Sequence, residues 1–262
     1  MSHRPRKRFS QNFLIDDTVI AEIVEAVAPR AGDLVVEIGP GLGALTRPLS
    51  RAVSPLHVVE IDRDIVARLR SEFPIERLVI HEGDALEFDF AGLGTALRIV
   101  GNLPYHISTP LLFHLAERAQ VIADIHVMLQ SEVVERMVAP PGGSEYGRLS
   151  VMLQYHFEME KILDIPADAF RPAPKVESAV VRMTPRPADS PRARDERLFA
   201  QTVLAAFSQR RKTLRNTLGG ALTPRDFEIL GIDPQARAQT LSVADFVRIA
   251  DHRAAGLTHP MV

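Results

Sequence analysis

The feature that most constrains the fold of this chain is an apolar run that leads directly into closely spaced glycines. Residues 34–38 read Leu-Val-Val-Glu-Ile, and residues 39–44 read Gly-Pro-Gly-Leu-Gly-Ala. A buried strand, a glycine-rich turn and then a helix are typical of the first βα unit of a doubly wound α/β fold. Three glycines within five positions exceed what a plain tight turn requires. We therefore expect a ligand to approach this turn closely, at Gly39 and Gly41.

Polar side chains lie at or just after the ends of three further strands, which we expect at residues 56–62, 78–81 and 97–100. Glu60 lies about 20 residues after the first glycine, where a carboxylate can accept bonds from both hydroxyls of an adenosine ribose. Asp84 can accept a bond from an adenine amine or simply cap a turn. Because ligands bind at the carboxyl ends of parallel strands, Gly39, Glu60, Asp84 and Asn102 are expected to meet at one edge of the sheet.

The turn after the fourth of these strands reads Gly101-Asn102-Leu103-Pro104-Tyr105. The Asn102 side-chain oxygen and a backbone carbonyl, of Gly101 or Leu103, can accept the two N–H bonds of an exocyclic amine. Pro104 stiffens the turn, and Tyr105 offers a flat face on which a base can stack. The alternative is an ordinary turn whose tyrosine packs in the core, because short motifs occur by chance.

Composition limits the classes of protein that the chain can belong to. Its 262 residues suffice for one large domain or for a large and a small one. The absence of cysteine excludes disulfides, thiolate metal sites and a cysteine nucleophile. No apolar stretch approaches the length of a membrane span, and the basic N-terminus lacks the apolar core of a signal peptide, so we expect a cytoplasmic protein. The net charge is only -2, so any nucleic-acid binding has to come from local patches.

Two basic segments are candidates for such patches. Residues 3–8 form a basic arm, and four cations lie within six positions of what we expect to be one helix: Arg210, Arg211, Lys212 and Arg215. Phosphate contact is the functional interpretation of both segments. A solvated terminus and a solvated helix face are the structural alternatives.

The second half of the chain predicts the end of the sheet and then a helical region. A fifth strand is expected at residues 125–129, and an antiparallel pair at 153–165 and 178–183. Phe170 starts a proline-rich loop between the two paired strands and is either a second stacking face or a core residue. A linker rich in proline and charge divides the chain into a domain at 1–187 and an all-helical domain at 188–262.

Taken together, these motifs resemble those of a known family. The glycine turn with Glu60 and Asp84 is similar to the S-adenosylmethionine site of Rossmann-like methyltransferases, and residues 102–105 resemble the motif of amino-group methyltransferases that act on adenine. Residues 11–14, 170–178 and 210–216 narrow the match to the ribosomal RNA adenine dimethyltransferase family, and in particular to its bacterial small-subunit members. The resemblance covers nearly the whole chain.

The resemblance implies a fold and an activity. The fold would be a seven-stranded, mostly parallel sheet whose last strand is antiparallel, with a small helical domain that binds RNA. The enzyme would use S-adenosylmethionine, without a metal, to dimethylate N6 of two adjacent adenosines in the 3′-terminal hairpin of small-subunit ribosomal RNA, on immature 30S particles. Implied cofactor contacts are Asn12, Leu14, Gly39, Gly41, Glu60, Asp84 and Asn102; implied catalytic residues are Asn102, Leu103 and Tyr105. Implied RNA contacts are Phe170, Arg210, Arg211, Lys212 and Arg215.

Three alternatives remain open at this point. A large-subunit ribosomal RNA adenine methylase would share the cofactor motifs and a similar turn at Asn102. A nicotinamide oxidoreductase also fits the glycine spacing, but the turn at residues 102–105 counts against it. A non-enzymatic assembly factor would bind immature small subunits through the basic patches, and this role is compatible with catalysis. We expect the protein to be a monomer.

Overall fold

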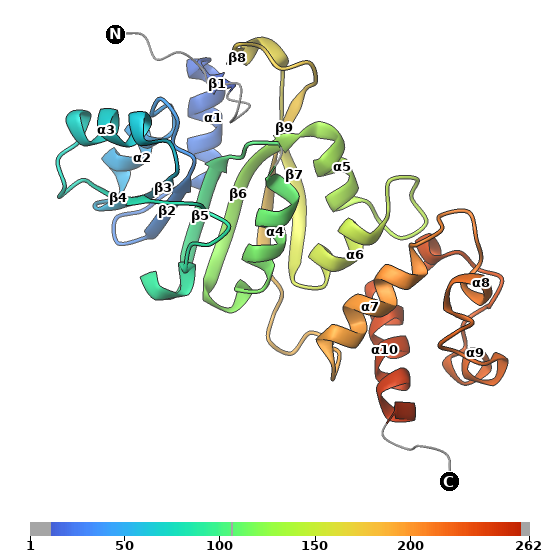
Figure 1. The fold of residues 1–262 in the computed structure, drawn as a ribbon. Coiled ribbons are helices and arrows are strands. Elements are labelled where there is room, and N and C mark those ends of the chain that lie inside the picture. Colours follow the sequence, from blue (N-terminus) through green and yellow to red (C-terminus); the bar gives the residue numbers. More distant parts are fainter. Residues whose placement is uncertain (1–11, 106, 258–262) are drawn as a thin grey trace. The chain divides into compact units, whose positions relative to one another are not determined.

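The structure is a computed structural model that describes residues 12–105 and 107–257 (Figure 1). The basic arm at residues 3–8 and Gln11 therefore lie outside the described residues. The chain forms two compact units, one of residues 1–134 with 157–185 and the other of residues 135–156 with 186–262. The second segment of this second unit begins at Arg186, near the expected linker, but the unit also includes residues 135–156, which we had placed in the first domain.

A seven-stranded sheet forms the centre of the first unit, in the order β4-β3-β2-β5-β6-β9-β7. The first five strands in this order are parallel, whereas β9 is antiparallel to both of its neighbours. The strands are β2 (Leu34–Ile38), β3 (Leu56–Glu60), β4 (Leu78–Glu82), β5 (Leu97–Asn102), β6 (Ile122–Gln130), β7 (Phe157–Ile165) and β9 (Ser178–Pro185). The expected mostly parallel sheet with its last strand reversed is confirmed.

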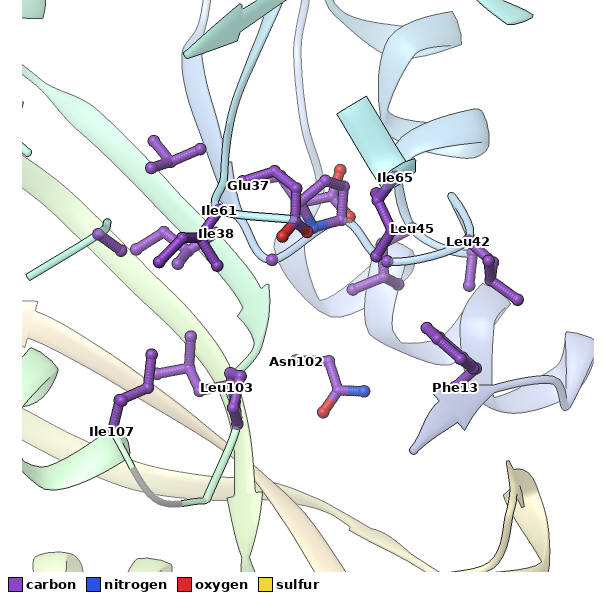
Figure 2. A pocket seen from close by; sticks show the side chains of 18 of the residues that line it. Phe13, Glu37, Ile38, Leu42, Leu45, Ile61, Ile65, Asn102, Leu103 and Ile107 are labelled. Atoms are coloured by element: carbon purple, nitrogen blue, oxygen red, sulfur yellow. The ribbon is translucent and has the colours of Figure 1, made fainter. Parts of the chain in front are cut away.

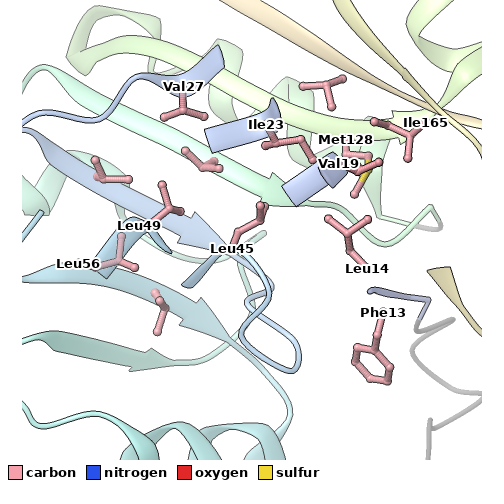
Figure 3. Packing of buried hydrophobic residues seen from close by; sticks show 14 of the residues in the cluster. Phe13, Leu14, Val19, Ile23, Val27, Leu45, Leu49, Leu56, Met128 and Ile165 are labelled. Atoms are coloured by element: carbon pink, nitrogen blue, oxygen red, sulfur yellow. The ribbon is translucent and has the colours of Figure 1, made fainter. Parts of the chain in front are cut away.

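The helices that accompany the sheet are α1 (Asp17–Val27), α2 (Thr46–Ala52), α3 (Arg63–Glu72), α4 (Ser108–Ala116) and α5 (Ser131–Val138). Asp16 caps α1 by accepting bonds from the N–H groups of Thr18 and Val19. One face of α1 carries Val19, Ile23 and Val27, which pack with Met128 of β6 and Ile165 of β7 (Figure 3). Buried residues of α2 and α3 belong to the same apolar cluster.

A second, two-stranded sheet was not expected from the sequence. Strand β1 (Phe13–Leu14) pairs antiparallel with β8 (Phe170–Arg171), so that Leu14 lies opposite Phe170. Each strand has only two residues and shows no periodicity, so only the pairing itself reveals it. The pairing connects the beginning of the described chain to the loop between β7 and β9.

The second unit is helical, as expected. Its helices include α6 (Arg148–Gln154), α7 (Glu196–Ala206), α8 (Leu214–Leu218), α9 (Pro224–Leu230) and α10 (Val243–Leu257). The capping box between Thr223 and Asp226 is present, and Ser242 exchanges equivalent bonds with Asp245. Phe199, Phe246 and their neighbours form its core. A short 3-10 helix at Ala238–Thr240 also belongs to this unit, and further short 3-10 helices lie in the first unit at Phe90–Leu93, Ala119–Val121 and Ala167–Ala169.

Two predictions about local structure were wrong. The strand expected from residue 153 begins only at Phe157, because residues 153 and 154 complete α6. The helix expected to contain four cations begins only at Leu214, after Thr213 adopts an extended conformation. Consequently, only Arg215 of the four basic residues is helical, and the other three lie in the turns that follow α7.

Candidate functional site

A pocket lies at the carboxyl ends of the parallel strands (Figure 2). The residues that follow β2, β3, β4 and β5 line it, together with β1. Nine residues of the predicted cofactor and catalytic sets are in this lining: Asn12, Leu14, Gly39, Gly41, Glu60, Asp84, Asn102, Leu103 and Tyr105. The structure therefore brings together residues that are up to 93 positions apart at the edge of the sheet where a doubly wound fold binds ligands.

The glycine-rich turn passes close to other parts of the site. Gly41 has a φ of +53°, and a Cβ added there would lie 3.3 Å from the ring of Phe13. A Cβ at Gly101 would lie 2.6 Å from the carbonyl oxygen of Ile38, so β5 can approach β2 closely only with glycine at this position. Arg47 holds the turn from outside the pocket, because its guanidinium donates to the carbonyls of Leu42 and Gly43.

Two carboxyl groups are buried in the pocket wall. Glu60 ends β3, and its Oε1 accepts a bond of 2.8 Å from the N–H of Asp62. Burial raises the pKa of Glu60, while bonds from backbone N–H groups oppose this rise. Glu37 on β2 is 2% exposed, and its Oε2 has no hydrogen-bond partner among the described residues. Burial, with the charge of Glu60 as a smaller cause, raises the pKa of Glu37 to about 8.

Glu37 was missed in the sequence analysis. It lies inside the apolar run at residues 34–38, which we interpreted only as a buried strand. A single acidic residue within such a run was the available signal, because a carboxyl group is rarely buried unless it has a partner or a function.

Asp84 combines both of the roles that were considered for it. Its Oδ1 accepts a bond of 2.9 Å from the N–H of Leu86, as expected for a residue that caps a turn. It also lines the pocket, where a carboxylate can accept a further bond because it carries about four lone-pair sites.

The side-chain amide of Asn102 is oriented by a backbone group. Its Nδ2 donates a bond of 3.2 Å to the carbonyl oxygen of Asn12. Figure 2 shows the nitrogen of this amide on the side of Phe13 and the oxygen turned away from it. The geometry thus leaves the Asn102 oxygen to accept a bond from a molecule in the pocket.

The rest of this turn is tied to the sheet and to α4. The N–H of Leu103 donates to the carbonyl of Met128 on β6, and Ser108 donates its hydroxyl hydrogen to the carbonyl of Tyr105. The phenol of Tyr105 lies 3.0 Å from the hydroxyl oxygen of Ser178. Three separate anchors therefore fix the backbone of residues 103–105 and the ring of Tyr105.

The predicted RNA contacts do not lie in the pocket lining. Phe170 is 4% exposed and belongs to the core cluster of the first unit, so the stacking role predicted for it is not supported. Pairing of β8 with β1 turns its ring into the core. Arg210, Arg211, Lys212 and Arg215 are exposed on the second unit, and the guanidinium of Arg210 bonds the carbonyl of Ser144.

The described residues contain neither a helix that could cross a membrane nor a cluster of side chains that could bind a metal. None of the helices between residues 12 and 257 combines the length and the apolar character that crossing a membrane requires. Within the same part of the chain, no three His, Asp or Glu side chains are grouped so that they could hold a metal ion.

Comparisons with curated proteins identify close relatives. The chain is 62% identical over 252 residues to the ribosomal RNA small subunit methyltransferase A of Thiobacillus denitrificans, and the alignment covers 96% of this chain and 99% of the relative. It is 61% identical to the protein of the same name from Aromatoleum aromaticum, over 97% of this chain and 96% of the relative.

Solved structures share the fold over both units. A dimethyladenosine transferase from Plasmodium falciparum matches with a TM-score of 0.78 at 24% identity, over 90% of this chain and 95% of the other. The 23S rRNA methyltransferase ErmE matches with a TM-score of 0.74 at 25% identity, over 93% of this chain and 100% of the other. The expected fold, that of S-adenosylmethionine-dependent methyltransferases, is confirmed.

The family comparison covers almost the whole sequence. A model of the family described as ribosomal RNA adenine dimethylase matches residues 2–254. A match of this extent, together with relatives that are about 60% identical over 96% or more of their length, establishes membership. The chain belongs to the ribosomal RNA adenine dimethylase family.

Proposed function

We propose that this chain dimethylates N6 of adenosine in small-subunit ribosomal RNA, with S-adenosylmethionine as the methyl donor. The observation that carries the proposal is the Asn102 amide, whose oxygen is left to accept a bond at a pocket lined by two buried carboxyl groups. The small subunit is favoured over the large one because the relatives of about 60% identity are named for the small subunit, whereas ErmE is 25% identical.

The residues of the pocket fit the proposed methyl donor. Glu60 would accept bonds from the ribose hydroxyls and Asp84 from the adenine amine, while Gly39 and Gly41 leave space beside the turn. Asn12 and Leu14 would complete the wall from β1. The buried carboxyl of Glu37 also borders this pocket, and a positively charged molecule bound there would lower the pKa of Glu37.

When bound, S-adenosylmethionine supplies an electrophilic methyl group on a sulfonium centre. The protein then has to orient a poor nucleophile, because the N6 lone pair of adenine is delocalised into the ring. Asn102 would accept one N–H bond of the amine, and this bond strengthens as N6 gains positive charge. The carbonyl of Leu103, or that of Gly101, would supply the second acceptor, whereas the carbonyls of Pro104 and Tyr105 already accept bonds from Ile107 and Ser108.

A second methyl transfer requires the site to tolerate the loss of one N–H bond. Asn102 is suited to this because its neutral oxygen, left without a partner, costs less than a buried carboxylate would. Tyr105 would replace the stacking that the base loses when it leaves the RNA.

The exposed cations of the second unit would contact phosphates of the RNA. We place the functional boundary between the catalytic and the RNA-binding domain near residues 187 and 188.

The proposal extends to the substrate and the setting. It includes two adjacent adenosines in the 3′-terminal hairpin, a role on immature 30S particles, a cytoplasmic location and a monomeric protein. The family resemblance supports the first two points. The lack of a membrane-crossing helix in the described residues is compatible with the third.

Labelled S-adenosylmethionine offered with unmethylated small subunits and, in parallel, with large-subunit RNA tests the proposal. Mass spectrometry would identify the methylated nucleosides. We expect N6,N6-dimethyladenosine in the small-subunit RNA only. Label confined to the large-subunit RNA would favour the large-subunit methylase, and tight particle binding without any label would leave a non-enzymatic assembly factor.

A further inference from the structure

Ser178 is held rigidly beside the pocket without lining it. It is the first residue of β9 and is 1% exposed. Its backbone is paired on both sides, with Gln130 of β6 and with Ile165 of β7. The carbonyl of the preceding residue accepts a bond of 3.0 Å from the N–H of Ser131. The hydroxyl of Ser178 therefore occupies a fixed point in the sheet.

Tyr105, by contrast, lies in a turn and is only partly buried. Its ring lines the pocket, and its phenol reaches across β6 to the Ser178 hydroxyl at 3.0 Å. A side chain in a turn has several rotamers available, and a bond to a fixed partner at the end of the ring selects one of them. Ser178 thus determines the orientation of the aromatic ring of Tyr105.

We propose that Ser178 is a positioning residue that acts through Tyr105, and that its effect falls mainly on the second methyl transfer. This inference rests on the proposed function, because it concerns a base that is methylated twice. Ser178 itself does not touch the substrate: it is enclosed by the sheet, and only its hydroxyl meets the ring.

The unequal effect on the two steps follows from the number of bonds that hold the base. An unmethylated amine offers two N–H groups, to Asn102 and to a backbone carbonyl, and these two bonds already fix the orientation of the base. A monomethylated amine offers one, so the base can pivot about the single remaining bond. The stacking face of Tyr105 then becomes the second constraint on in-line alignment, and alignment dominates the rate of such a displacement.

The test compares Ser178→Ala, Tyr105→Phe, the double variant and Ser178→Thr, which retains the hydroxyl. Ser150→Ala is the matched control, because Ser150 is also buried and bonded to a backbone carbonyl, that of Arg136 in the second unit. Single-turnover reactions on unmethylated small subunits would be quenched at intervals, and the two methylated nucleosides separated by mass spectrometry. Calorimetry would measure the dissociation constant for S-adenosylmethionine.

We expect Ser178→Ala to slow the second transfer about tenfold and the first less than about threefold, so that N6-monomethyladenosine accumulates. Tyr105→Phe should reproduce this pattern, and the double variant should add nothing, since both changes remove one bond. The cofactor dissociation constant should stay within about twofold, Ser178→Thr should restore the ratio of products, and the Ser150→Ala control should not alter it.

Equal slowing of both steps, or additive effects in the double variant, would overturn the inference while leaving the proposed function intact. Wild-type protein that forms no methyladenosine would instead remove the proposed function, and the inference with it. If Ser178→Ala does not fold, Tyr105→Phe removes the same bond from the pocket side without changing the sheet, and an unchanged product ratio in that variant would be decisive against the inference.

Discussion

Substitution of Glu37 by glutamine tests how the pocket is built in the absence of any ligand. Glu37 is 2% exposed, and burial raises its pKa from an ordinary value of 4.5 to about 8. In the folded protein the carboxyl group therefore keeps its proton at neutral pH, whereas in the unfolded chain it loses it. Glutamine has nearly the shape of the protonated acid but cannot ionise, so the substitution removes the titration and little else.

The sign and the size of the effect follow from this difference in pKa. The folded state binds the proton more tightly than the unfolded state, so stability decreases as the pH rises from about 4.5 to about 8 and is level outside that window. The full difference corresponds to about 5 kcal/mol. This is a large part of the 5 to 15 kcal/mol by which domains are usually stable, so the effect should be readily measured.

Urea unfolding followed by circular dichroism at several pH values between 4.5 and 8.5 would measure this pH dependence of the free energy of unfolding. We expect the free energy of unfolding of the wild type to fall by several kcal/mol across the window and that of Glu37→Gln to fall much less. Glu37→Gln should consequently be the more stable protein at pH 8. Glu76→Gln, an exposed position in the same unit, is the control and should follow the wild type. Parallel curves for Glu37→Gln and the wild type would refute the argument.

Three further variants test the proposed roles in the pocket and on the second unit. Asn102→Ala should lower turnover about 100-fold with little change in cofactor affinity, because its bond strengthens mainly in the transition state; near-normal dimethylation would contradict this. Glu60→Ala should weaken cofactor binding about 10- to 100-fold in calorimetry, since it removes charge-assisted bonds to hydroxyls; an unchanged dissociation constant would take Glu60 out of the site. Replacing Arg210, Arg211 and Arg215 together with alanine should weaken RNA binding and should reduce the slope of log affinity against log salt concentration by about two. An unaltered slope would mean that these residues form only a solvated surface.

The parts of the site that could be predicted from the sequence are those encoded locally. A strand that ends in Gly39, Glu60, Asp84 or Asn102 carries its own signal, and the rule that parallel strands share a carboxyl edge then brings the four together. The positions of β1 and β8 could not be predicted, because two-residue strands about 160 positions apart leave no periodicity in either segment.

Two other differences between the structure expected from the sequence and the structure observed also have specific physical causes. The basic run before α8 was expected to begin a helix, but residues 209–213 contain no apolar residue that could anchor them to a core before Leu214. In a protein, helices are stabilised chiefly by packing of an apolar face, so the helix begins only where that face begins. Phe170, for which a stacking face and a core position were both considered, packs in the core because pairing with β1 makes its segment part of the fold.

The unexpected β1–β8 pair also accounts for a feature of the catalytic turn. An asparagine can present its oxygen reliably only if its nitrogen is engaged elsewhere, and the partner that engages Asn102 is the carbonyl of Asn12. Asn12 immediately precedes β1, whose position depends on its pairing with β8. The ability of Asn102 to accept a bond is therefore supported from outside the Rossmann-like sheet, by two segments whose sequence contains no sign that they meet. An aspartate at position 102 would face the Asn12 carbonyl with a second acceptor, so the neutral amide fits both sides of its environment.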